Sequence, residues 1–122
     1  MKTILVIDDA ATIRMYHRHI FENAGYHVDE AINGIEALEK ALVNNYDLFI
    51  VDINMPKLDG YGFLHQLRSQ DIDQAPAIMV STESAKNDEI LAYNAGANLY
   101  LIKPTKPDEL LCYSQLLLGE SI

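Results

Sequence analysis

Three apolar runs of strand length in this chain each end in charged residues. The runs and the charges that follow them are 4–7 with Asp8 and Asp9, 48–51 with Asp52, and 99–102 with Lys103. In parallel α/β sheets the carboxyl ends of the strands meet at one edge, and ligands bind outside that edge. If the three runs are parallel strands of one sheet, three carboxylates and one ammonium group share a pocket there.

The composition of that pocket indicates its chemistry. Three neighbouring carboxylates repel one another unless a cation lies between them. A site built of oxygen ligands suits Mg²⁺, which proteins bind through one or two carboxylates together with substrate phosphates. The sequence therefore predicts an acidic Mg²⁺ site that handles phosphoryl groups.

Strand-length runs alternate with helix-period segments along the whole chain. The expected strands are 3–8, 27–31, 47–52, 77–81 and 99–103. Strict alternation is typical of βαβ units with a parallel sheet. Right-handed crossovers leave few arrangements, so we predict an α/β, flavodoxin-like fold. It is a doubly wound five-stranded parallel sheet of order 2-1-3-4-5 with five helices.

The helices are expected to bury one apolar stripe each. The first three stripes are Ile13, Tyr16, Ile20 and Ala24; Ile35, Leu38, Ala41 and Leu42; and Phe63, Leu64 and Leu67. Asn33 and Glu36 have the spacing of a capping box, and Thr105 and Asp108 have that spacing before the last helix. Gly96 suits a left-handed cap at the end of the fourth helix.

Size, charge and cysteine usage narrow the class of protein. The 122 residues predict a single domain over 1–122. The formal charge of −9 leaves no basic face for the phosphates of nucleic acid, which argues against nucleic-acid binding. No apolar run reaches the 18 residues of a membrane helix, and Cys112, the only cysteine, cannot form an intrachain disulfide. We therefore expect a cytoplasmic protein with no membrane insertion.

Several short motifs follow one another in a fixed order. They are Asp8-Asp9 with Arg14 shortly after, Asp52-Ile53-Asn54-Met55-Pro56, Asp59-Gly60, Val80-Ser81, Ala95-Gly96-Ala97 and Lys103-Pro104. With these motifs the chain resembles the receiver domain of bacterial response regulators, most of all the stand-alone chemotaxis type. The resemblance runs from residue 3 to about 118. It implies a two-component signalling protein rather than an enzyme, and we expect no output domain after the last helix.

The resemblance implies a role for each charged residue of the pocket. Asp52 would accept a phosphoryl group from a histidine kinase. Asp8, Asp9, Asp52 and the backbone carbonyl of Asn54 would bind Mg²⁺, and Lys103 would contact a phosphoryl oxygen. It also implies that the Lys103–Pro104 peptide bond is cis.

The resemblance further implies a switch built from Ser81 and Tyr100. Ser81 would contact the new phosphoryl group, and Tyr100 would turn from exposed to buried. The surface of the fourth helix, fifth strand and fifth helix of the monomer would then change for a downstream partner: a flagellar motor component, a kinase or a phosphotransfer protein. Asn54 and Glu83 occupy the positions that tune dephosphorylation, and this pair implies fast self-dephosphorylation.

Other functions stay open on the residues alone. A phosphorelay shuttle or phosphate sink would share the fold. A Mg²⁺-dependent aspartyl phosphatase would need an Asp-x-Asp pair after the first strand, which the chain lacks. A flavodoxin-like cofactor carrier would need a Gly/Ser/Thr-rich phosphate loop there, and Asp8-Asp9-Ala10-Ala11 would repel a flavin phosphate. The chain departs from the family at Thr105, where an aromatic residue commonly follows Lys-Pro, so packing near the last helix is open. The four histidines, which lack metal-ligand spacing, are expected at the surface or as satisfied core residues: His17, His19, His27 and His65.

Overall fold

The computed structural model describes residues 1–83 and 86–120. Strands and helices alternate along the chain in the order β1 (Thr3–Ile7), α1 (Ala11–Asn23), β2 (His27–Ala31), α2 (Gly34–Val43), β3 (Leu48–Asp52), α3 (Gly60–Arg68), β4 (Ala77–Ser81), α4 (Lys86–Ala95), β5 (Leu99–Ile102) and α5 (Pro107–Leu117). The strands form one parallel sheet of order β2-β1-β3-β4-β5. The predicted fold is therefore confirmed, with β1, β3 and β5 each one residue shorter than expected.

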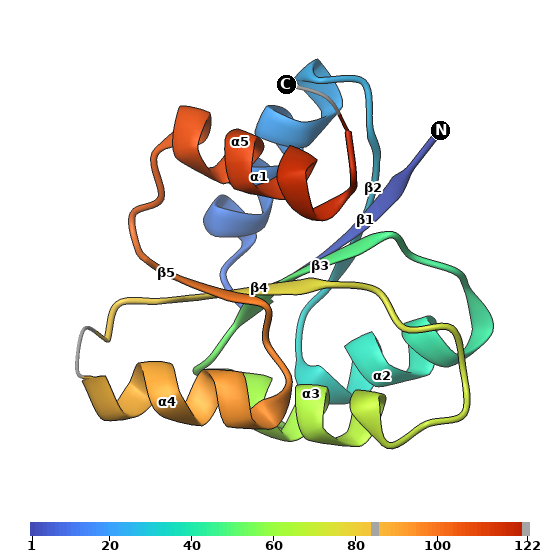
Figure 1. The fold of residues 1–122 in the computed structure, drawn as a ribbon, viewed down its shortest axis with the longest axis vertical. Coiled ribbons are helices and arrows are strands. Elements are labelled where there is room, and N and C mark those ends of the chain that lie inside the picture. The colour runs from blue at the N-terminus through green and yellow to red at the C-terminus, as the bar shows by residue number, and fades with distance from the viewer. Residues whose placement is uncertain (84–85, 121–122) are drawn as a thin grey trace.

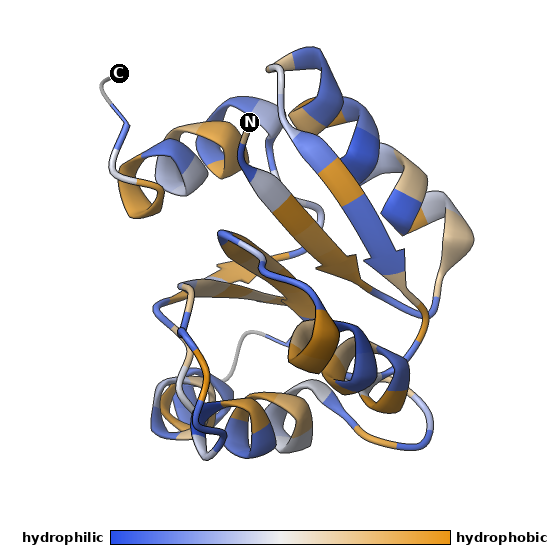
Figure 2. Ribbon diagram, turned by 90° about the vertical axis from the view of Figure 1, so that its right-hand side faces the viewer, coloured by the Kyte–Doolittle hydropathy of each residue, from blue (hydrophilic) through white to orange (hydrophobic). Residues whose placement is uncertain are grey.

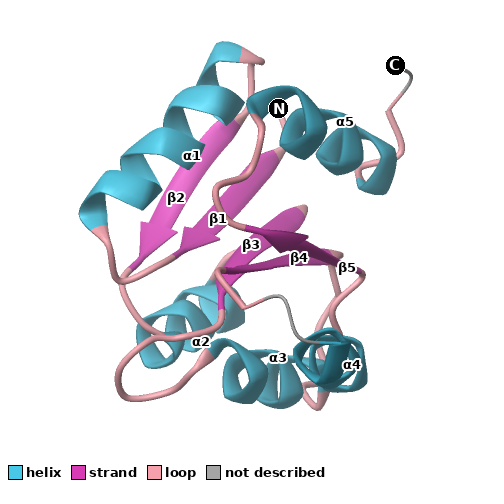
Figure 3. Ribbon diagram, turned by 90° about the vertical axis from the view of Figure 1, so that its left-hand side faces the viewer, coloured by secondary structure: helices cyan, strands magenta, loops and turns pink. Residues whose placement is uncertain are grey.

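The sheet separates two layers of helices. Helices α1 and α5 cover one face, and α2, α3 and α4 cover the other (Figures 1 and 3). Successive side chains of a strand point to opposite faces, so a strand covered on both sides is apolar throughout. β3 and β4 are accordingly buried at every position. Figure 2 shows β1 mainly in the apolar colour, whereas the edge strand β2 is mostly hydrophilic, in agreement with its partial exposure.

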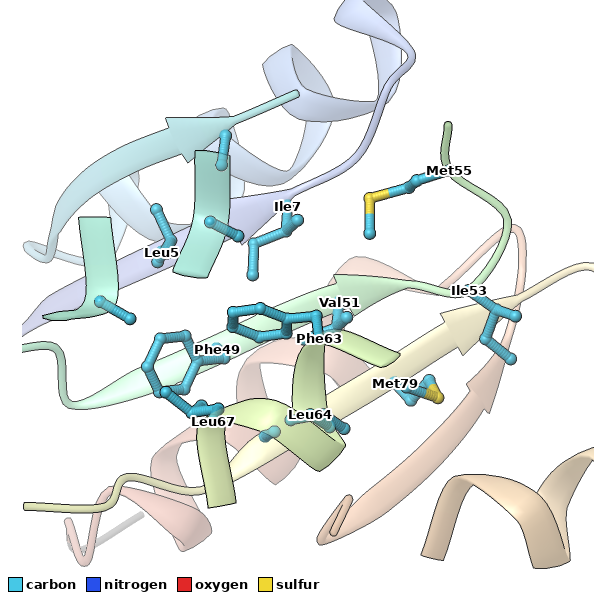
Figure 4. Close-up of a cluster of buried hydrophobic side chains, with 14 of the residues drawn as sticks. Leu5, Ile7, Phe49, Val51, Ile53, Met55, Phe63, Leu64, Leu67 and Met79 are labelled. Carbon is cyan, nitrogen blue, oxygen red and sulfur yellow. The ribbon is translucent and has the colours of Figure 1, made fainter. Parts of the chain in front are cut away.

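The core on the α2–α4 side is built around β3 and α3. Figure 4 shows Phe63, Leu64 and Leu67 of α3 beside Phe49 and Val51 of β3, and all five side chains are buried. The rings of Phe49 and Phe63 meet edge to face with centroids 5.8 Å apart, a favourable aromatic geometry. The predicted buried stripe of the third helix is confirmed.

The buried face of α1 differs from the predicted stripe. His17 and Phe21 are buried, Ile13 and Ile20 are partly buried, and Tyr16 is 39% exposed. Ala24 lies outside the helix as its C-cap and is exposed. The helix face that packs on the sheet thus includes His17. The prediction, which used apolar residues alone, wrongly assigned Tyr16 to that face.

The buried face of α2 is made of small residues. Ala37 and Ala41 are buried, whereas Ile35 and Leu42 are 42% and 44% exposed, so burial of these two larger residues was wrongly predicted. A Cβ atom on Gly34, at the start of α2, would lie 2.3 Å from the Leu58 carbonyl oxygen. This close approach explains why the helix presents alanines inward.

Two of the three predicted helix-end signals are confirmed. Asn33 caps α2 by accepting a hydrogen bond from the backbone N–H of Glu36 at 2.8 Å, and Gly96 follows α4 with a φ of 115°, a left-handed conformation that favours glycine. The predicted Thr105 cap is wrong, because α5 begins after Lys106 and Thr105 is buried. In the described ranges, no helix has the length and apolar character needed to cross a membrane.

Candidate functional site

The carboxyl ends of β1, β3 and β5 carry the charged residues of the site. Asp8 and Asp9 follow β1, Asp52 ends β3, and Lys103 follows β5. β1 and β3 are neighbours, with Ile7 in register with Val51, which brings Asp8 beside Asp52. One carboxylate oxygen from each of the three aspartates lies within 4.8 Å of the others. The predicted gathering of these groups is confirmed.

Lys103 connects two of the carboxylates. Its ammonium nitrogen lies 2.7 Å from Oδ2 of Asp8 and 3.0 Å from Oδ1 of Asp52. Both aspartates are buried, and the peptide bond between Lys103 and Pro104 is cis, as the resemblance implied. Three carboxylates face one ammonium group, so this cluster carries a formal excess of two negative charges.

Burial and the neighbouring charges shift the pKa values of this pair. Burial raises the pKa of Asp52, the hydrogen bond from Lys103 opposes that rise, and the carboxylates of Asp8 and Asp9 add to it, so the pKa is above its ordinary value. Burial alone would lower the pKa of Lys103, but its hydrogen bonds with Asp8 and Asp52 outweigh burial and raise it. Lys103 therefore stays charged and favours the ionised form of Asp52.

The donor set fits a small divalent cation. The cluster offers carboxylate oxygens and excess negative charge, which is what Mg²⁺ prefers. Mg²⁺–oxygen distances of about 2.1 Å place two ligands of one ion at most about 4.2 Å apart, close to the observed spread of 4.8 Å. Asp9 and Asn54 are exposed, so water has access to the cluster from their side.

The predicted switch residues, Ser81 and Tyr100, lie on β4 and β5, and both form hydrogen bonds with the backbone of Glu83 after β4. Ser81 ends β4 and is buried, and its hydroxyl oxygen accepts a hydrogen bond from the backbone N–H of Glu83 at 3.0 Å. A hydroxyl that accepts a hydrogen bond still has its own proton to donate. Tyr100 on β5 donates its hydroxyl to the carbonyl oxygen of Glu83 at 2.5 Å. Only 9% of Tyr100 is exposed, so this structure has the buried orientation and not the exposed one expected before phosphorylation.

Gly60, part of the Asp59-Gly60 motif, lies too close to the backbone of Asp52 to carry a side chain. A Cβ atom at this position would lie 2.4 Å from the backbone oxygen of Asp52. The Gly60 N–H also donates to the carbonyl oxygen of Ile53 at 2.8 Å. Only glycine permits this close approach, which folds the loop after β3 back against the strand that carries Asp52.

His17 and Lys103 line the same pocket. His17 was expected at the surface or as a core residue with its hydrogen bonds satisfied, and it is neither. It is buried, its Nε2 lies 3.5 Å from the Thr105 hydroxyl, and its Nδ1 has no hydrogen-bond partner among the described residues. Tyr16 donates its hydroxyl to the Thr105 carbonyl oxygen at 2.7 Å. Thr105, which replaces the family's common aromatic residue, thus connects the loop after β5 to α1.

Comparison with known families agrees with this geometry. The model of the response regulator receiver domain matches residues 4–114. The chain belongs to this family. Receiver domains are signalling components of two-component systems, and the strand-end cluster described above lies within the matched region.

Known relatives and solved structures resemble this receiver domain over nearly its full length. The transcriptional regulatory protein ResD of Bacillus subtilis is 37% identical over 115 residues, which cover 94% of this chain and 47% of ResD. The chain thus spans less than half the length of that relative. The chemotaxis protein CheY4 of Vibrio cholerae is 35% identical, with 96% and 98% of the two chains covered and a TM-score of 0.90. The response regulator TrrA of Thermotoga maritima, solved with Mg²⁺–BeF, is 36% identical, with 96% and 99% covered and a TM-score of 0.86.

Proposed function

We propose that this receiver domain accepts a phosphoryl group on Asp52 from a histidine kinase, in the presence of Mg²⁺. The observation that carries the proposal is the position of the Asp52 carboxylate. It is buried, lies 3.0 Å from the Lys103 ammonium group, and shares a cluster with Asp8 and Asp9. A phosphoryl group arriving there would meet a nucleophile, a cation and a metal-binding donor set at once.

The residues that would hold Mg²⁺ are Asp8, Asp9, Asp52 and the backbone carbonyl of Asn54. When bound, the metal supplies charge neutralisation for the transferring phosphoryl group. The metal-bound form reported for TrrA supports this assignment by similarity. The local donor set supports it independently, because an excess of carboxylate charge is costly unless a cation offsets it.

The chemical step requires little covalent work from the protein. A carboxylate oxygen of Asp52 forms a bond to phosphorus while the bond from phosphorus to the donor histidine nitrogen breaks. The nitrogen keeps that electron pair and takes up a proton. Lys103 stays charged and keeps its contact with one phosphoryl oxygen as that oxygen moves. The Ser81 hydroxyl donates a hydrogen bond to another phosphoryl oxygen. The product is an aspartyl phosphate.

We assign the output to chemotaxis-type signalling. The likeness to CheY4 over nearly the whole chain supports this assignment. Exposed apolar side chains on α4, β5 and α5 offer a surface for a protein partner, and they include Ile90, Tyr93, Ile102 and Tyr113. Asn54 and Glu83 are both exposed, which gives water access for self-dephosphorylation.

Uptake from a small phosphodonor tests the proposed chemistry. The wild type is incubated with acetyl phosphate with and without Mg²⁺, and intact mass is recorded. We expect the mass of one phosphoryl group with Mg²⁺, and none for Asp52→Asn. Asp59→Asn is the matched control, because it removes the same charge and its side-chain oxygen can still cap α3. Uptake by Asp52→Asn equal to that of the wild type would overturn the proposal.

A binding measurement tests the proposed output. Affinity for a flagellar motor switch protein is measured with the free and the phosphorylated receiver domain. Tighter binding of the phosphorylated form supports chemotaxis-type signalling. Transfer of the phosphoryl group to a histidine phosphotransfer domain, with no change in motor binding, would support a relay instead. Steady turnover of free phosphate esters would support an aspartyl phosphatase.

A further inference from the structure

Every polar atom of Asp8 forms a hydrogen bond, with partners from the turn after β1, from β2, from α1 and from the end of β5. Its N–H donates to the carbonyl oxygen of Ala31 at 3.1 Å, and its Oδ1 accepts from the N–H of Ala10 at 2.9 Å. Its Oδ2 accepts from Lys103. Its carbonyl oxygen accepts from Nη1 of Arg14 at 2.8 Å. The last contact comes from a side chain to which the proposed chemistry assigns no role.

Arg14 is itself held in place by β2. Its Nε lies 2.7 Å from Oε1 of Glu30, and only 15% of its side chain is exposed. The other oxygen of Glu30 accepts from Nε of Arg18 at 2.6 Å. A guanidinium group is a planar fork with a fixed arrangement of donors. With Glu30 at one side of the fork and Asp8 at the other, the Arg14 plane has one orientation.

The fixed orientation of Arg14 also fixes the position of the Asp9 backbone, through the peptide group that joins Asp8 to Asp9. The carbonyl of Asp8 and the N–H of Asp9 belong to one planar unit, so fixing the oxygen also fixes where the Asp9 backbone begins. Within residues 1–83 and 86–120, no protein donor holds the exposed carboxylate of Asp9. Its place in the cluster therefore depends on the backbone that carries it.

We propose that Arg14 is a positioning residue for the divalent-cation site. Its guanidinium group fixes the Asp8–Asp9 peptide plane and so keeps the Asp9 carboxylate beside those of Asp8 and Asp52. This inference rests on the proposed Mg²⁺ site. It makes a prediction opposite to simple electrostatics, because a positive charge near a cation site repels the cation. Loss of Arg14 should weaken Mg²⁺ binding, although loss of its charge alone would strengthen it.

Calorimetric titration with Mg²⁺ tests the inference. Arg14→Ala removes the contact and the charge, and Arg14→Lys keeps the charge without the planar fork. We expect both to weaken Mg²⁺ binding by about tenfold, the lower end of the range for residues that support metal ligands. Arg18→Ala is the matched control, because Arg18 shares Glu30 but has no hydrogen bond to Asp8. It should bind Mg²⁺ as tightly as the wild type or slightly more tightly.

A second readout separates positioning from general destabilisation. Urea unfolding in chelator should give similar free energies for Arg14→Lys and Arg18→Ala. The amide of Ala10, which donates to Oδ1 of Asp8, should exchange faster with solvent in Arg14→Lys alone. If Arg14→Ala fails to fold, Arg14→Lys decides the question. Unchanged or tighter Mg²⁺ binding by Arg14→Lys overturns the inference and leaves the proposed function standing. Failure of the wild type to bind Mg²⁺ overturns the proposed function itself.

Discussion

The ammonium nitrogen of Lys103 lies 3.0 Å from Oδ1 of Asp52, although 51 positions separate the two residues in the chain. In the sheet β4 lies between β3 and β5, so Lys103 contacts Asp52 across the carboxyl end of β4. The pair is enclosed in a cluster that still has excess negative charge. The stability of the protein, its dependence on Mg²⁺ and its response to pH are therefore coupled at this cluster.

Removal of one carboxylate should stabilise the metal-free protein. Asp9→Asn relieves repulsion with Asp8 and Asp52, and charges about 4 Å apart in water interact by about 1 kcal/mol. We expect the free energy of unfolding in chelator to rise by about that amount and most of the stabilisation by Mg²⁺ to disappear. Urea unfolding with chelator or Mg²⁺ measures both. Asp71→Asn, at an exposed acid, should change neither, and equal Mg²⁺ stabilisation of Asp9→Asn and wild type would contradict the site.

His17 should make stability depend on pH. Burial lowers its pKa from 6.5 to about 4, with Asp8 opposing and Lys103 adding to the shift. The folded state then binds fewer protons than the unfolded state between these values, so stability present above pH 6.5 is lost as pH falls toward 4. The full loss is about 3 kcal/mol.

The variant His17→Gln isolates this contribution. The free energy of unfolding of the wild type relative to His17→Gln should fall by about 3 kcal/mol between neutral pH and pH 4. His65→Gln, at an exposed histidine, serves as the control in the same urea titrations. Parallel curves for wild type and His17→Gln would show that His17 titrates normally in the folded protein.

Loss of the Tyr100 hydroxyl should loosen the segment after β4. In Tyr100→Phe the carbonyl oxygen of Glu83 loses its donor, and we expect the free energy of unfolding to fall by about 1 kcal/mol. Tyr93→Phe on α4, where the ring is 41% exposed, should change it by less than about 0.5 kcal/mol. Chemical unfolding in chelator measures both variants. A Tyr100→Phe protein as stable as the wild type would mean that the hydrogen bond does not hold the buried orientation.

The topology and the charged cluster followed from the sequence because both depend on strand ends. Each apolar run had strand length and ended in a polar residue, and parallel strands place those ends together. The positions of Asp8, Asp52 and Lys103 could therefore be predicted without knowing any side-chain contact. The Phe63 stripe was equally clear, because its apolar residues share one helical face.

The remaining features depend on the distance between elements. Whether α2 buries Ile35 or Ala37 is decided by how closely Gly34 lets it approach the loop after β3. A buried histidine at position 17 carries no apolar signal, and the contact of Arg14 with a backbone carbonyl depends on the turn after β1. Such contacts leave no periodic pattern in a single sequence.

Locating the phosphoryl group on the chain tests the central claim most directly. The protein is phosphorylated with acetyl phosphate and Mg²⁺ and treated with borohydride, which reduces an aspartyl phosphate to homoserine, and its peptides are sequenced by mass spectrometry. We predict homoserine at position 52 and no other, with none when Mg²⁺ is withheld. Homoserine at Asp8 or Asp9, or a phosphorylated protein with Asp52 intact, would contradict the account.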